Sequence, residues 1–290
     1  TITSINVKPL LNDEDLLNYL SDRLVAIGDS VPESLPSFKF PNVEDPLKDL
    51  AVLDYRNYPA ALFAEPGEKQ PNRAGMAKWG SWLNSYCREK YGRPLVLACS
   101  ADLAESTNIA GFAKDFSPEL KNYGWYERHK NPEGVLLPQE ITEFTNSGMM
   151  CGVASVNLSL TPYENWIGFI GACSTYGSFS YLKYGPMRLF SQVAQDSQIK
   201  VGKVIWVAGH SGPETAEDSR THFGIFAPGV TQLFPTSRVI NLRPYDYNEV
   251  APMLGAALAT DCAIIALHLT RPSIEIMDRA ALGVPSYFEA

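Results

Sequence analysis

The chain has 290 residues, of which 45% are hydrophobic and 19% are charged, and this is the composition of an ordinary globular protein. Its formal net charge of −8 at pH 7 argues against a general nucleic-acid-binding or anionic-membrane surface, and no apolar run approaches the roughly 20 residues that a membrane-spanning helix needs. The five cysteines form no CxxC pair and have no zinc-ligand spacing, so we expect reduced, buried thiols and a cytoplasmic location.

Residues 1–70 are predicted to form an N-terminal helix and an extended arm. Residues 12–27 carry apolar side chains at helical spacing, behind Asn12 or Asp13 as the N-cap. The residues that follow are rich in proline and show no periodicity, which is typical of an ordered arm that wraps around a domain.

Residues 71–290 are predicted to form one domain in which helices alternate with strands. We expect helices at 75–92, 145–160, 181–197, 221–234 (broken) and 248–260, and strands at 94–100, 165–173, 203–209, 238–244 and 262–269. The strands are apolar throughout, which predicts an α/β fold: a doubly wound, mostly parallel sheet with helices on both faces. In such sheets the ligand lies beyond the carboxyl ends of the strands.

The stretch "GHSGPETAEDSRTHFG" (209–224) directly follows a predicted strand and holds two of the four histidines. A serine hydrolase elbow at Ser211 would need the pattern G-x-S-x-G, but Pro213 takes the place of the final glycine. A zinc site is a second alternative, although the spacing of His210 and His222 matches no local ligand pattern. A solvated acidic loop with incidental histidines is the third.

The same stretch resembles a loop of the transketolase family of thiamine diphosphate enzymes, which runs H-D-S-x-x-x-G-E-D-G-P-T-H. The first histidine, a Glu-Asp pair and a Thr-His pair occur here at that spacing. Four further segments resemble motifs of the family in the same order: "CSADLAES" (99–106), "EITEFTNSGMMCG" (140–152), "TYGSFSYLKYGPMRL" (175–189) and "LRPYDYNEV" (242–250). The resemblance covers only the family's central, pyrimidine-binding domain. The segment that holds Mg²⁺ and the diphosphate in the family has no counterpart in this sequence.

The resemblance implies a set of residues that bind thiamine diphosphate. Glu143 takes the position of the carboxyl group that hydrogen-bonds the pyrimidine nitrogen and activates the cofactor. Phe179 takes the position of the aromatic ring that stacks on the pyrimidine, with Tyr176 beside it, and Leu182 replaces a third aromatic residue. Asp102 is expected at the cofactor or at a dimer contact. An alternative role for Glu143 is that of a helix cap.

The resemblance also implies residues that bind the substrate. His210 and His222 are expected to project into the substrate channel and to act on sugar oxygens during catalysis. Asp218 is expected to bind a hydroxyl group of the sugar. Three residues are expected near the substrate phosphate: Arg73, Ser106 and Arg271. No residue of this chain is expected to bind a metal ion.

The sequence therefore predicts the pyrimidine-binding subunit or fragment of a transketolase-like enzyme, which transfers a two-carbon ketol unit between sugars or sugar phosphates, as in the pentose phosphate pathway. A diphosphate-binding domain or subunit would complete the site and supply Mg²⁺, so we expect a dimer or hetero-oligomer and an inactive isolated chain. Departures from the family motifs, such as Phe144 in place of histidine and Ser219-Arg220 in place of Gly-Pro, leave the substrate open. The alternatives are a thiamine enzyme subunit that decarboxylates a 2-oxo acid and a non-catalytic assembly subunit.

Overall fold

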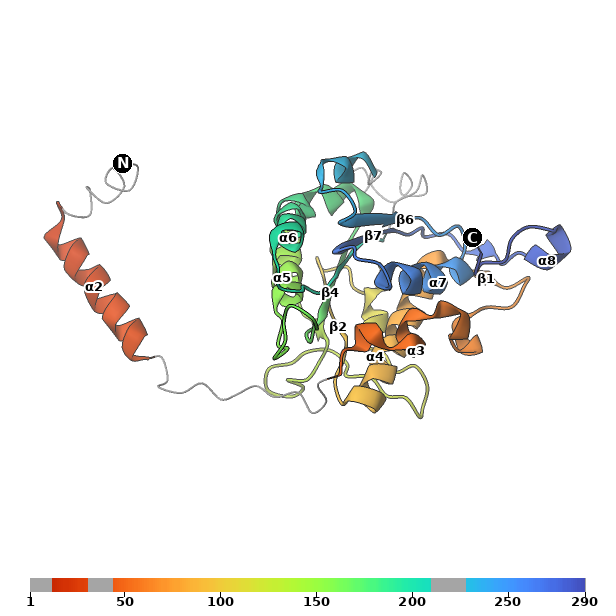
Figure 1. Cartoon of the computed structure of the whole chain (residues 1–290), viewed down its shortest axis with the longest axis horizontal. Coiled ribbons are helices and arrows are strands. Elements are labelled where there is room, and N and C mark those ends of the chain that lie inside the picture. Colours follow the sequence, from red (N-terminus) through yellow and green to blue (C-terminus); the bar gives the residue numbers. More distant parts are fainter. Residues whose placement is uncertain (1–11, 31–43, 210–227, 290) are drawn as a thin grey trace. The chain divides into compact units, whose positions relative to one another are not determined.

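The computed structural model describes residues 12–30, 44–209 and 228–289 (Figure 1). The chain divides into two compact units, residues 1–40 and residues 41–290. No helix of the described ranges is both long and apolar enough to span a membrane.

The first unit contains the helix α2 (Glu14–Asp29). Its N-cap is Asp13, whose carboxylate accepts a hydrogen bond from the backbone N–H of Leu16 at 2.9 Å. This bond satisfies one of the free N–H groups at the helix start. The acidic residues of the first turn are also stabilised by the positive end of the helix dipole. The helix predicted behind Asn12 or Asp13 is thus confirmed, with Asp13 as the cap.

The second unit is built on a six-stranded sheet in which all paired strands are parallel. In spatial order the strands are β3 (Leu136–Leu137), β2 (Val96–Ser100), β4 (Ile170–Thr175), β5 (Val204–Ala208), β7 (Ile264–His268) and β6 (Val239–Leu242). Every residue of β4, β5 and β7 is buried, as their largely apolar sequences predict. A separate antiparallel pair joins β1 (Lys69–Gln70) to β8 (Ile274–Glu275).

Helices cover both faces of this sheet (Figure 1). Along β5, Ile205 and Val207 join one buried cluster while Trp206 and Ala208 join the other, since neighbouring strand residues point to opposite faces. The first cluster includes residues of α3 (Leu50–Leu53), α4 (Asn72–Tyr91) and α7 (Tyr247–Leu258), and the second includes residues of α5 (Glu143–Ser155) and α6 (Tyr184–Asp196). The predicted doubly wound α/β fold is confirmed.

Short helices fill the connections. These are the 3₁₀ helices η1 (Pro46–Lys48), η2 (Tyr55–Asn57), η3 (Ala60–Leu62), η4 (Ile109–Ala113), η5 (Gly177–Lys183) and η7 (Pro228–Leu233), and the helix α8 (Arg279–Leu282). The helix predicted at 145–160 begins at Glu143 and ends at Ser155, and η7 is the described part of the broken helix predicted at 221–234.

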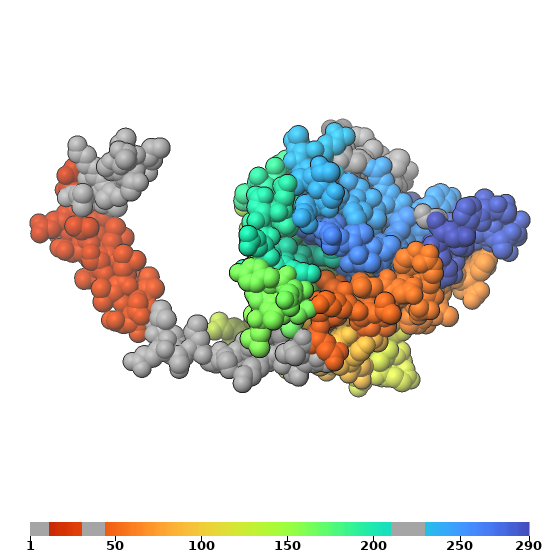
Figure 2. All heavy atoms as spheres, viewed as in Figure 1, coloured from red at the N-terminus to blue at the C-terminus, as the bar shows by residue number. Residues whose placement is uncertain are grey.

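Residues 44–70 pack against the sheet domain. Val52, Tyr58 and Leu62 are at most 6% exposed and belong to the same buried cluster as α4 and α7. In Figure 2 this segment, in orange, lies directly against the blue surface of α7. The second compact unit therefore includes residues 44–70, whereas the composition of the sequence assigns them to the N-terminal arm.

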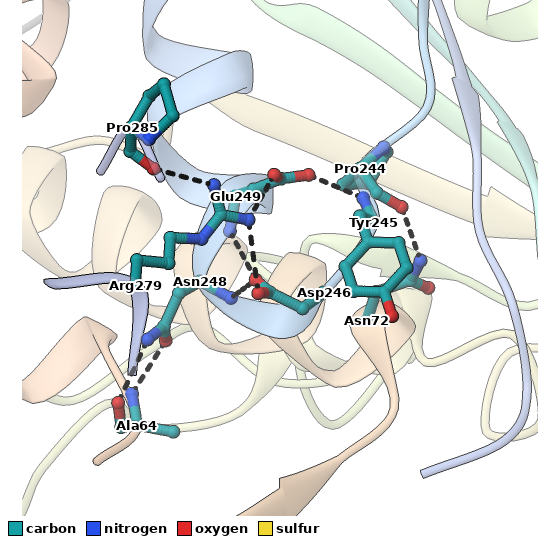
Figure 3. A network of polar contacts seen from close by, with 9 residues as sticks. All are labelled: Ala64, Asn72, Pro244, Tyr245, Asp246, Asn248, Glu249, Arg279 and Pro285. Carbon is teal, nitrogen blue, oxygen red and sulfur yellow. Dashed lines mark hydrogen bonds and ion pairs between the residues drawn. The ribbon is translucent and has the colours of Figure 1, made fainter. Parts of the chain in front are cut away.

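A polar network fixes the start of α7 to the rest of the second unit (Figure 3). Asp246 is the N-cap of α7 and accepts hydrogen bonds from the backbone N–H groups of Asn248 and Glu249 at 2.9 and 3.2 Å. The amide of Asn248 exchanges two hydrogen bonds with the backbone of Ala64, at 2.8 and 2.9 Å. Arg279 of α8 forms ion pairs with both Asp246 and Glu249. The motif "LRPYDYNEV" is therefore a structural junction in this chain.

Candidate active site

Glu143 lies at the start of α5 and is 5% exposed. Its Oε1 accepts a hydrogen bond of 3.0 Å from the hydroxyl group of Thr175, the last residue of β4. The N-cap residue of α5 is Thr142, and its side chain makes no capping hydrogen bond. The carboxyl of Glu143 is thus held against the carboxyl end of a central strand, where ligands bind in sheets of this kind.

Three more of the residues named from the sequence meet at the same edge. The hydroxyl of Tyr176, just after β4, donates to the Oγ of Ser106 at 3.1 Å. The guanidinium of Arg73, in the first turn of α4, donates to the backbone carbonyl of Ser106. Ser106 lies in the connection that follows β2. Two motifs and the start of α4 are therefore joined by hydrogen bonds to Ser106.

A cavity of about 810 Å³ opens beside these residues. Its wall brings Asp102, Ser106 and Tyr176 together with Trp125 and with Thr142, which precedes Glu143. Asp102 has a φ angle of 59°, in the left-handed region that non-glycine residues rarely adopt. Such strain is found where a loop is fixed by its surroundings, and this loop forms one side of the cavity.

Buried hydroxyl groups beneath the cavity were not predicted. The hydroxyl of Ser174 on β4 donates to that of Ser100 on β2 at 2.8 Å and lies 2.7 Å from the hydroxyl of Thr107. All three residues are at most 3% exposed. The signal available in the sequence was a serine at the end of β2 and another next to the end of β4.

The apolar residues named from the sequence lie on η5 and around it. Phe179 is half-buried, while Leu182 is 54% exposed and Phe144 is 64% exposed. Phe144 lies close to α6, because a Cβ atom on Gly185 would come within 3.0 Å of its ring. Apolar surface is therefore exposed next to the buried carboxyl of Glu143.

His268 ends β7 and is 6% exposed. Its Nε2 lies 3.3 Å from the side-chain oxygen of Asn241. Burial, together with the charge of Arg243, lowers the pKa of His268 to about 4, so its imidazole is neutral at pH 7. Arg271, three residues further on, is exposed and does not line the cavity beside Ser106.

His210, Ser211, Asp218 and His222 lie outside the described residues. The described residue before them, Gly209, donates its backbone N–H to the carbonyl of Thr175 at 2.8 Å. The loop therefore begins at the strand end that also holds Glu143. Within the described part of the chain, no group of three or more His, Cys, Asp or Glu side chains is placed to hold a metal ion.

Comparison with known proteins gives one family and several structures. The family model described as "Transketolase, pyrimidine binding domain" matches residues 80–275. The chain is similar to the transketolase from Leishmania mexicana, with 17% identity and a TM-score of 0.52 over 77% of this chain and 28% of that one. It is also similar to the transketolase from Campylobacter jejuni subsp. jejuni, with 20% identity and a TM-score of 0.53 over 79% of this chain and 30% of that one. No curated protein sequence matches.

At these identities the structural likeness shows the fold, and the chain spans less than a third of the length of either solved structure.

Proposed function

Because the chain belongs to the transketolase family through its pyrimidine-binding domain, we propose that it binds the aminopyrimidine of thiamine diphosphate and takes part in ketol transfer. The reaction would move a two-carbon ketol unit between sugar or sugar-phosphate substrates. The observation that carries the proposal is the buried carboxyl of Glu143, held by Thr175 at the carboxyl edge of the sheet. We also propose a cytoplasmic location and a role in carbohydrate metabolism, in the pentose phosphate pathway.

The residues present fit the pyrimidine part of this cofactor. Thr175 fixes one oxygen of Glu143, and this hydrogen bond holds the carboxyl that would bind a ring nitrogen. Phe179 and Leu182 offer apolar surface for the ring, as a flat aromatic ligand requires. When bound, the cofactor would supply a nucleophilic thiazolium carbon and an electron sink for the substrate. The role of Glu143 is to share a proton with the pyrimidine nitrogen.

The remaining residues would bind the substrate. Ser106 and Arg73 lie together and, with Arg271, would bind a substrate phosphate. His210, Asp218 and His222 would hydrogen-bond the sugar, donating to oxygens that gain charge during the reaction. Asp102 would contact the cofactor or the partner subunit.

The site would be completed by a diphosphate-binding domain or subunit, which would hold Mg²⁺. The exposed apolar side chains of Phe144 and Leu182 would be covered when that partner binds. The chain alone would then be inactive, and the working enzyme would be a dimer or hetero-oligomer. Decarboxylation of a 2-oxo acid remains the rival reaction, since it uses the same cofactor.

The proposal is tested by Glu143→Gln in the chain assembled with its diphosphate-binding partner. The amide has nearly the same shape but cannot share a proton with the pyrimidine nitrogen in the same way, so turnover should fall roughly a hundredfold or more. Glu164→Gln, at an exposed carboxyl in the connection that leads into the amino end of β4, is the matched control and should keep full turnover. Ketol transfer and 2-oxo acid decarboxylation are assayed in parallel. Full ketol transfer by Glu143→Gln contradicts the proposal.

A further inference from the structure

Lys183, the last residue of η5, has no exposed surface although it carries an amine. Its Nζ donates hydrogen bonds to the backbone carbonyls of Cys173 on β4, at 2.9 Å, and Val207 on β5, at 3.4 Å. The amine is therefore anchored between two central strands, near their carboxyl ends. A buried amine is costly unless something compensates it, and such groups cluster at functional sites.

Lys183 and Glu143 both form hydrogen bonds with residues of the same strand, β4. Cys173 accepts the hydrogen bond from Lys183, and Thr175, two residues further along β4, donates to Glu143. Two residues along a strand are about 7 Å apart and present their side chains on one face. The helix α5, which carries Glu143, packs against both β4 and η5.

Among the residues that the structure describes, the titratable groups that face Lys183 are Cys173 of β4, Cys99 of β2 and Glu143 of α5. Burial lowers the pKa of the Lys183 amine, and these three groups act in the opposite direction. Burial also raises the pKa of both thiols, so neither thiol carries a charge at neutral pH. Glu143 is then the one group of the three that can present a negative charge to the amine.

We propose that Lys183 is a positioning residue for Glu143, and that the carboxyl of Glu143 supplies the counter-charge to the buried amine of Lys183. The pairing of the two side chains needs no cofactor and can be tested in the isolated chain. Its effect on catalysis rests on the proposed function, in which Glu143 shares a proton with the pyrimidine. A cation behind the carboxyl would set how readily that proton is shared.

The chain offers a second buried lysine for comparison. Lys203 is 6% exposed, and its amine also donates to two backbone carbonyls, those of Thr260 and Cys262. The groups that face it are Cys262, Asp261 and Arg238, and Glu143 is not among them. Lys203 therefore matches Lys183 in burial and hydrogen bonding but not in its relation to Glu143.

The first test measures the pairing in the isolated chain. The titration of each lysine is followed by NMR of ¹³C-labelled lysine side chains, and the Lys183 signal is identified by its loss in Lys183→Met or Lys183→Arg. Glu143→Gln should lower the pH midpoint of Lys183 by about one pH unit, because the amide no longer stabilises the ammonium. Glu164→Gln should leave this midpoint in place, and the midpoint of Lys203 should not respond to Glu143→Gln. An unchanged Lys183 midpoint in Glu143→Gln overturns the proposal.

The melting temperature gives a second reading if the lysine signals overlap. Glu143→Gln should lower it more in the native background than in Lys183→Met, because only in the native chain does the substitution leave a buried ammonium without a counter-charge. Equal shifts in the two backgrounds overturn the pairing.

In the assembled enzyme, Lys183→Met should shift the pH profile of kcat, whereas Lys203→Met should not.

The pairing and the proposed function can be contradicted separately. If Glu143→Gln shifts the Lys183 midpoint but keeps full turnover, the pairing of Lys183 with Glu143 is supported and the proposed function is contradicted. If the variant loses turnover but leaves the Lys183 midpoint unchanged, the proposed function is supported and the pairing is contradicted.

Discussion

Arg279 forms an ion pair with Glu249, although thirty residues of sequence separate them. The guanidinium lies on α8 and the carboxylate in the first turn of α7, and their side chains are only 11% and 8% exposed. A second carboxylate, that of Asp246, lies 3.4 Å from the same nitrogen and is 1% exposed. One cation therefore neutralises two buried carboxylates at the start of α7 (Figure 3).

We predict that Arg279→Met destabilises the second unit by about 3 to 5 kcal/mol, because it leaves two buried carboxylates without a counter-charge. The measurement is urea unfolding followed by circular dichroism. Lys130→Met is the control, since its pair with Glu127 is 83% and 53% exposed and should contribute at most about 1 kcal/mol. Equal unfolding midpoints for the two variants would contradict this account of the network.

The stability of the fold should depend on His268 between pH 7 and pH 5. Its pKa is about 4 in the folded chain and 6.5 in the reference state, so the unfolded chain binds the additional proton in this window. Stability is therefore complete above pH 6.5 and is lost as the pH falls toward 4. Protonation should account for about 2 kcal/mol between pH 7 and pH 5.

Urea unfolding at both pH values measures this dependence. His268→Gln should flatten it relative to the native chain, while His129→Gln, at an exposed histidine, should not. Identical pH slopes in the native chain and in His268→Gln would show that burial does not hold the imidazole neutral.

The isolated chain should bind thiamine diphosphate only weakly and without dependence on Mg²⁺. The reason is that the sequence carries no counterpart of the segment that holds the metal ion and the diphosphate in the family. Isothermal calorimetry with and without Mg²⁺ is the measurement. Tight, Mg²⁺-dependent binding by this chain alone would mean that it contains a diphosphate site of its own.

His210→Ala and His222→Ala should each reduce ketol transfer in the assembled enzyme. Each variant loses a hydrogen bond that strengthens as charge develops on the substrate, which is equivalent to about 2 to 4 kcal/mol in the barrier. Ser211→Ala should retain activity, and a zinc chelator should have no effect. The opposite pattern, an inactive Ser211→Ala beside two active histidine variants, would favour the serine hydrolase alternative.

The sequence by itself determined the type of fold and its family. The largely apolar runs at 94–100, 203–209 and 262–269, which alternate with helices, favoured strands buried on both faces, as in a parallel sheet covered by helices on both sides. The N-cap of α2 was also predictable, because an aspartate before an apolar helix satisfies a local need of the backbone. Glu143 and Ser106 were named from short motifs that needed no knowledge of distant residues.

Only the tertiary structure decided which of these residues meet. β1, β3 and β8 are two residues long, too short for any periodicity, and they exist because a partner strand lies beside them. Residues 44–70 lack a regular pattern, yet they pack into the core because their apolar side chains match the surface of α4 and α7. Lys183 gave no signal, since its burial depends on two carbonyl groups that belong to other strands. Local interactions can be read from neighbouring residues, whereas burial and pairing depend on contacts that form only when distant segments fold together.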